Sequence, residues 1–410
     1  MDNSHRYNVA VIVSLIWAVL LPWMVSPLYG QQAGGYQTSV QPDLWFNSVD
    51  GIRVGAELNG WQEGATLRGS HRLDAAAWLG LWFPSLPVSY RIRYTEPVPA
   101  LSKRESEFHL RLLSMVREGY QKHGAGLVKR WQHGEEYRRF LEIGGSYHIA
   151  QRFDHVYLLD RQLWSNEWMG LFSGMIEYQH PGERGYFFFQ IESQIHTLEN
   201  PFHAASIQVA KRLELGGGWV VRARIFGGIA GRNSRPEYRY QLSSGTPVQA
   251  VEHPITRSRG TIPPDWIRGG WVHHSGGPNM RGFTDLDRAA LNRGESRLYR
   301  QAGSLNLELD LPNPIQQSIE SMEELNDILS FRSYLFYGIA EVDKGLLKDT
   351  HGLFSEAGAG IALGWIVPDH KGRDRGLVLR YESPFWLSET RDEPAWEWRH
   401  LFGIGAVITF

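Results

Sequence analysis

Several long stretches of this chain alternate between apolar residues and polar or small ones, and this period of two constrains the fold more than any other feature. The alternation is clearest towards the C-terminus, at residues 305–311, 353–365 and 402–410. Earlier examples lie at 52–59 and 88–95. Because successive residues of a β-strand point to opposite faces of a sheet, this period predicts strands with one apolar and one polar face.

The length and polarity of these stretches favour a membrane barrel over a soluble sandwich. A tilted membrane strand needs ~9–11 residues, whereas strands of soluble proteins average ~5–6, and the stretch 353–365 is longer than either. The polar faces mix glycine with charges of both signs, as a crowded lumen would, and Trp and Tyr gather near the strand ends. A hydrophobic content of 42% and a mean hydropathy of −0.34 exclude a bundle of membrane helices but permit a barrel. A secreted soluble β protein remains the alternative.

The N-terminus reads as a targeting segment. His5 and Arg6 precede an apolar run from Val9 to Val25, and the small residue Gly30 follows. This order predicts a secretory signal peptide at 1–30. The alternative is an N-terminal membrane anchor, which Pro22 would kink.

We expect the mature chain to be one domain: a short periplasmic segment at 31–50, then a barrel over 51–410. The fold class is all-β, a single transmembrane antiparallel β-barrel of about sixteen strands. The candidate strands are 51–60, 62–70, 75–83, 87–95, 107–118, 139–150, 154–160, 168–179, 185–197, 202–214, 218–228, 301–311, 332–343, 353–365, 376–385 and 399–410.

Three segments depart from the strand rhythm. Residues 105–121 fit an amphipathic helix as well as a strand, and residues 314–329 have helical spacing that predicts a short helix in a turn. The connection 229–300 is rich in Gly, Pro and Arg and shows no clear alternation. Unstructured connections of this length are usually functional.

Composition excludes several kinds of site. The chain has no Cys, so it holds no disulfide and no thiolate metal site. Its 42 Lys and Arg against 44 Asp and Glu give no support to a nucleic-acid partner. No nucleophile elbow, Gly-rich phosphate loop or HExxH pattern is present. We therefore expect no catalytic residue, no metal and no cofactor, and a protein that is not an enzyme.

Four ordered motifs in the last third of the chain resemble one superfamily. GGPNMRGF at 276–283 is similar to the RGF/Y motif in the sixth extracellular loop of BamA, TamA and FhaC-like transporters, the bacterial surface antigens. YLFYGIAEVDKG at 334–345 resembles their F-x-D-x-G strand, and the Gly-rich strand at 353–365 resembles their penultimate strands. The closing strand ends in Phe410, like the C-terminal signal that the barrel-assembly machinery reads.

The resemblance implies a loop folded back into the lumen. Arg281 would pair there with an acid on a lumen-facing strand, with Asp343 the first choice and Glu341 the second; both share a face with Tyr337 and Ile339. A planar guanidinium suits a carboxylate and stays charged when buried. Gly282 would allow a tight turn, and Phe283 would pack against the barrel wall.

One departure from the superfamily concerns the segment at 31–50, which is too short for a periplasmic POTRA module. The resemblance therefore implies a POTRA-less barrel in the bacterial outer membrane, working with a separate periplasmic or lipoprotein partner in protein assembly or translocation. Its other expected partners are outer-membrane lipid and, during biogenesis, the assembly machinery.

Two other functions stay open, a passive pore or surface scaffold and an outer-membrane enzyme. A plug locked by Arg281 would argue against an open pore. Ser/His or acidic clusters on the outward face would favour an enzyme.

Overall fold

A computed structural model of the chain describes residues 37–47, 51–62, 71–81, 88–103, 106–117, 119–132, 139–153, 165–182, 185–198, 201–243, 245–252, 277–283, 298–326, 328–345, 352–368, 374–389 and 394–407. The signal peptide predicted at 1–30 and the terminal Phe410 lie outside these residues, as do the strand predicted at 154–160 and nearly all of the one at 62–70.

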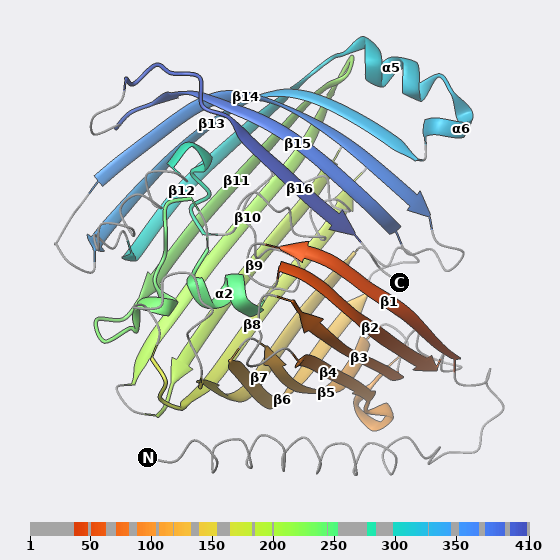
Figure 1. The fold of residues 1–410 in the computed structure, drawn as a ribbon, viewed down its shortest axis with the longest axis vertical. Coiled ribbons are helices and arrows are strands. Elements are labelled where there is room, and N and C mark those ends of the chain that lie inside the picture. Colours follow the sequence, from red (N-terminus) through yellow and green to blue (C-terminus); the bar gives the residue numbers. More distant parts are fainter. Residues whose placement is uncertain are drawn as a thin grey trace.

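One antiparallel sheet dominates the structure, and its sixteen strands pair in simple sequence order (Figure 1). They are β1 Gln37–Asn47, β2 Gly51–Gln62, β3 His71–Gly80, β4 Val88–Pro97, β5 Ser106–Arg117, β6 Tyr120–Gln132, β7 Phe140–Arg152, β8 Met169–Gly182, β9 Gly185–His196, β10 Phe202–Gly216, β11 Trp219–Ala230, β12 Tyr299–Leu311, β13 Leu329–Gly345, β14 Gly352–Pro368, β15 Asp374–Leu387 and β16 Leu401–Val407. The all-β class that the alternation predicts is confirmed.

The sheet curls on itself (Figure 1). Its two faces differ in polarity. The outward face carries exposed apolar side chains, such as Ile225, Leu335 and Trp365, which are 56%, 45% and 54% exposed. The inward face carries buried charged side chains, such as Arg224 and Glu308. This is the reverse of a soluble sandwich and the arrangement of a barrel whose outer surface faces lipid.

Short helices lie in two of the connections. The turn between β12 and β13 holds α5 Pro314–Glu320 and α6 Glu323–Asn326, which confirms the helix predicted at 314–329. Asn313 caps α5, its side-chain oxygen accepting from the backbone N of Gln316 at 2.7 Å. None of the helices in the described ranges combines the length and the apolar character that crossing a membrane demands.

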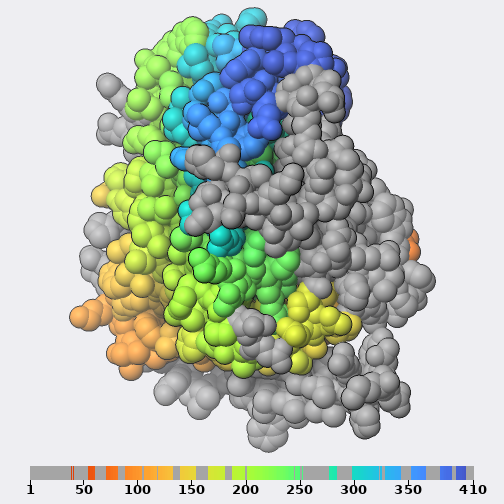
Figure 2. Space-filling view, turned by 90° about the vertical axis from the view of Figure 1, so that its left-hand side faces the viewer, coloured from red at the N-terminus to blue at the C-terminus, as the bar shows by residue number. Residues whose placement is uncertain are grey.

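The connection between β11 and β12 enters the curled sheet. Its described parts include the 3-10 turns η3 Pro236–Tyr238 and η4 Arg281–Phe283 and the helix α2 Pro247–Glu252. Figure 1 draws α2 within the outline of the sheet. Tyr238 and Val248 pack in one apolar cluster with side chains of β5 to β8 and of β10. Figure 2 faces this end of the molecule, with the green residues of the connection against yellow-green strand ends.

The structure decides one open alternative and corrects two expectations about the strands. Residues 106–117 form β5 and not an amphipathic helix. β1 lies within the segment 31–50 that was expected to precede the barrel, and it pairs along its whole length with β2. β6 was missed, because the period of two is broken in the first part of the strand. β2 pairs with β1 on one side and β3 on the other, so it lies inside the sheet and not at its edge.

Candidate functional site

The segment 277–283 lies buried inside the curled sheet, held there by main-chain contacts. The backbone N of Met280 donates to the carbonyl of Leu242 at 2.8 Å. Arg224 on β11 donates to the carbonyl of Gly277 at 2.8 Å, and Asn306 on β12 donates to that of Pro278 at 3.2 Å. The segment is therefore fixed to the barrel wall along its length and does not merely rest on it.

Arg281 makes the charged contacts of this segment. Its guanidinium donates to Glu308 of β12 at 3.0 Å and also to Glu382 of β15. It lies over the ring of Phe336 on β13, 4.3 Å from the centroid. The Arg281 side chain is 3% exposed and both acids are fully buried. One fork-shaped cation thus joins β12 and β15, which two other strands separate in the sheet order.

The carboxylates around Arg281 offset the cost of burying its charge. Burial alone would lower the pKa of the guanidinium, but Glu382 and then Glu308 raise it above its ordinary value. Both acids have further donors: Tyr334 donates to Glu382 at 2.8 Å, and Arg332 donates to Glu308 at 2.9 Å. The cation and its acids form a network in which each buried charge has an opposite partner.

Glu356 of β14 holds the backbone of the same turn. Its two carboxylate oxygens accept from the backbone N atoms of Arg281 at 3.1 Å and Gly282 at 2.6 Å. Main-chain donors at the start of a 3-10 turn have no partner within the turn, so a carboxylate placed there satisfies both. Glu356 therefore recognises the turn independently of the Arg281 side chain.

Gly282 and Phe283 fill the space beside the barrel wall. A Cβ on Gly282 would lie 2.4 Å from Cδ2 of Leu387 and 3.0 Å from Cβ of Pro384, so any larger residue would force Leu387 to shift. The expectation that Gly282 serves a tight turn is thus replaced by a close approach to β15. Phe283 is fully buried and meets Phe354 edge to face, with ring centroids 5.4 Å apart.

The carboxylates that bind Arg281 correct the expected partners, Asp343 and Glu341. On β13 the side chains of Tyr334 and Phe336 are 2% and 3% exposed and point inward, whereas Leu335 and Tyr337 are 45% and 39% exposed. Period two places Glu341 and Asp343 with the outward set, and Glu341 is exposed. The side chain of Asp343 lies outside the described part of the structure, and its backbone pairs with Gln301 of β12.

The sequence carried a signal that two of the three acids around this turn face the lumen. Glu308 belongs to the polar half of the 305–311 alternation, and Glu356 interrupts the Gly-rich face of the 353–365 stretch. A face-by-face reading of each strand would have placed both acids in the lumen. The resemblance directed attention to the D-x-G strand instead.

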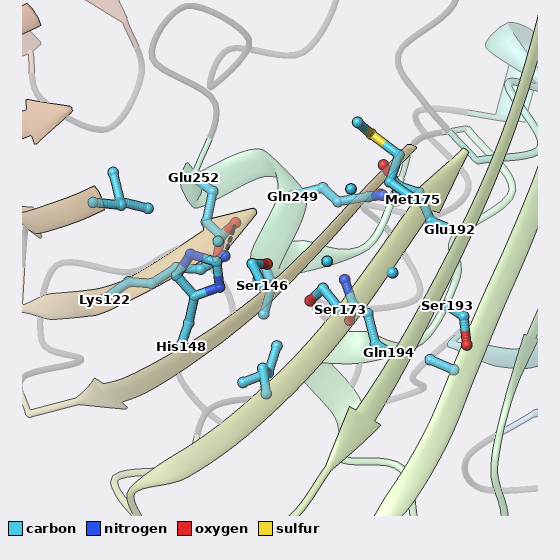
Figure 3. Close-up of a pocket in the computed structure, with 18 of the residues that line it drawn as sticks. Lys122, Ser146, His148, Ser173, Met175, Glu192, Ser193, Gln194, Gln249 and Glu252 are labelled. Carbon is cyan, nitrogen blue, oxygen red and sulfur yellow. Dashed lines mark hydrogen bonds and ion pairs between the residues drawn. The ribbon is translucent and has the colours of Figure 1, made fainter. Parts of the chain in front are cut away.

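A cavity of about 410 Å³ occupies another part of the lumen, beside α2 (Figure 3). Its wall is made largely of small and neutral polar residues of β6 to β10, among them Ser146, Ser173 and Gln194. At one side Lys122 donates to both oxygens of Glu252 at 2.9 and 2.8 Å, and Figure 3 draws His148 beside this pair. The cavity is thus bounded by the barrel wall and by the folded-in connection together.

Comparison with known proteins finds similarity of structure but none of sequence family. No family model matches the sequence, and no curated protein matches it. Among solved structures, the crystal structure of BamA from Haemophilus ducreyi lacking POTRA domains 1–3 is similar at a TM-score of 0.49 and 13% sequence identity. The similarity covers 90% of this chain and 70% of that chain.

Proposed function

We propose that this chain is a bacterial outer-membrane β-barrel in which β16 and β1 meet to close the sheet, with a lumen locked by the segment 277–283. The apolar outward face and the charged inward face support the membrane location. An unpaired sheet edge in lipid costs several kcal/mol for each backbone group, which favours closure. The long connection then lies on the extracellular side.

The observation that carries the functional proposal is the buried contact of Arg281 with Glu382 and Glu308. An open pore has no need of a plug fixed by a buried cation, by Glu356 and by main-chain contacts. A lumen closed at rest fits a barrel that opens only when a partner or client engages it. We therefore favour a role for the locked lumen in protein assembly or translocation, with a separate periplasmic or lipoprotein partner.

Conductance in planar lipid bilayers tests the lock. The wild-type chain should show a low resting conductance, and Arg281→Ala should raise it, since the segment 277–283 then loses its charged anchor. Ser333→Ala, on the outward face of β13, should leave conductance unchanged. A wild type that is steadily open, with conductance indifferent to Arg281, would make the passive pore the better reading.

Crosslinking and pull-down from outer membranes test the partner. A periplasmic or lipoprotein component that is recovered with the wild type, in near-equal amount and repeatedly, supports the assembly or translocation role. Recovery of the barrel alone, after crosslinking in intact cells, would leave a surface scaffold as the function.

A further inference from the structure

A buried polar cluster lies on the outward face of the barrel, where the proposed function predicts lipid. Ser114 of β5 and His123 of β6 sit directly opposite each other in the register of these strands. Their neighbours Met115 and Lys122 point inward, towards Val248 and Glu252 of the folded-in connection. Period two therefore turns Ser114 and His123 outward, on the face where Leu127 is 52% exposed.

The hydrogen bonds of this cluster run in one direction only. The carbonyl of Asn166 can only accept, and it accepts from Nε2 of Gln151 at 3.0 Å. Oε1 of Gln151 therefore accepts from Nε2 of Gln121 at 3.0 Å. Gln121 then presents its own Oε1 to Nε2 of His123, at 3.4 Å.

This direction fixes the histidine tautomer. With its proton on Nε2, the ring of His123 has a free lone pair on Nδ1, which accepts from the hydroxyl of Ser114 at 2.9 Å. Because Ser114 donates its only hydroxyl proton to His123, Tyr90 is the donor in the 3.3 Å contact between the two hydroxyls. A serine that donates to a histidine base, which a third group orients, is the arrangement that activates a serine nucleophile.

The depth of the cluster indicates the substrate. Ser114 lies three residues from the end of β5, which is ~10 Å along the strand. That end also meets the long connection, because Tyr120 and Lys122 bind Glu252. If the barrel spans the membrane as proposed, Ser114 lies near the outer boundary between headgroups and acyl chains, where the ester groups of lipids are found. Polar side chains facing lipid are costly and usually functional.

We propose that Ser114, His123 and Gln121 form a hydrolase site for acyl esters of membrane lipids. Ser114 Oγ attacks the ester carbonyl and passes its proton to Nδ1 of His123. The bond to the alcohol then breaks, and His123 returns the proton to the leaving alkoxide. Water attacks the resulting acyl-serine by the same route, giving a fatty acid and restoring Ser114. Ester and water are the only reactants, so no metal or cofactor is required.

The neighbouring residues have distinct roles in this site. The Tyr90 hydroxyl is placed to donate to the oxyanion that forms beside Ser114. Gln121 is a positioning residue, because it acts through the ring of His123. Ser114 is 3% exposed and His123 is 7% exposed, so the proposed reaction requires the side chains around them to move aside for the ester.

The test uses the full chain in detergent micelles and in vesicles of diacyl phosphatidylcholine. A fluorophosphonate probe should label the wild type, and mass spectrometry should place the label on Ser114. Vesicles should release free fatty acid. His123→Ala should lower both the labelling and the release by ~10²–10⁴-fold, the usual contribution of a general base. Gln121→Glu keeps an acceptor oxygen at the ring and should retain labelling that Gln121→Ala loses.

Ser333 supplies the matched control. It faces outward on β13, but its cross-strand neighbours are Leu311 and Ile361, so Ser333→Ala should change neither labelling nor release. Folding of each variant is checked by its heat-dependent mobility in gels. Folded wild type that takes no label and releases no fatty acid would overturn the proposal, as would release that survives Ser114→Ala. The two proposals can fail separately. The Ser114→Ala barrel should keep the low conductance of the wild type, and the Arg281→Ala barrel should still take the fluorophosphonate label.

Discussion

Replacing Arg281 by alanine should destabilise the folded barrel by ~3 kcal/mol. Removing one partner of a buried ion pair costs ~3–5 kcal/mol, because the other charge is left in a poorly solvated place. Here the two acids are fully buried, but Tyr334 still donates to Glu382 and Arg332 still donates to Glu308. The loss should therefore fall at the lower end of that range.

Glu382→Ala should cost a similar amount, since Arg281 keeps Glu308 as a partner. Two independent losses would sum to ~6 kcal/mol, but contacting residues in one network couple by ~0.5–3 kcal/mol. The double variant should therefore lose ~4 kcal/mol. Urea titration of the reconstituted protein, followed by the fluorescence of its Trp residues, measures each free energy of unfolding.

Arg232→Ala is the control for this cycle, because Arg232 is an exposed arginine in the same connection and its loss should stay within ~0.5 kcal/mol. Full additivity of the Arg281 and Glu382 losses would refute the coupling. An Arg281→Ala effect no larger than that of Arg232→Ala would refute the lock itself.

Three further predictions follow from the same geometry. Gly282→Ala should cost ~1–3 kcal/mol in a urea titration, because its Cβ would overlap Leu387; an unchanged midpoint would contradict the close approach. Burial raises the pKa of Glu237 from 4.5 to about 7, so the native state binds more protons than the unfolded state between these values, and stability should fall by up to ~3 kcal/mol as pH rises through them. Glu237→Gln should abolish that slope in the pH dependence of unfolding, and a slope that persists would assign it to another group. Cysteine pairs scanned along β1 and β16, in a chain with no native Cys, should crosslink at one register if the sheet closes, and failure at every register would oppose closure.

The strands that the sequence predicted are those whose outward face is apolar without interruption. In β12 and β14 the alternation covers most of the strand, so existence, type and approximate ends could be read directly. β1 escaped notice because Pro42 and Asp43 break its pattern. Strand pairing adds a constraint that the sequence does not display: β1 is a strand because all eleven of its residues pair with β2.

The sequence allowed Arg281 to be predicted as the buried cation, but it did not identify the acids that bind it. Arg281 stands out because MRGF is a short motif in an otherwise irregular connection. Its partners come from β12 and β15, which the sheet order separates by two strands. Only the curvature of the sheet and the path of the connection bring these positions together, and neither is written in the local sequence. The parity of β13 was readable, however, and would have excluded Glu341 and Asp343.

The sequence did not predict β6 because the polar residues of the proposed lipid-ester site interrupt its alternation. Its inward residues include Lys122, and its outward face begins with Gln121 and His123, so the period of two is broken in the first part of the strand. Polar residues on the lipid-facing side of a membrane strand reduce the free energy that holds it in lipid. Such residues are usually kept only where they have a function. The hydrogen-bonded chain from Asn166 to Ser114 satisfies these groups in a fixed order, which packing alone does not require. A gap in the alternation of an otherwise regular barrel is thus a guide to its chemistry.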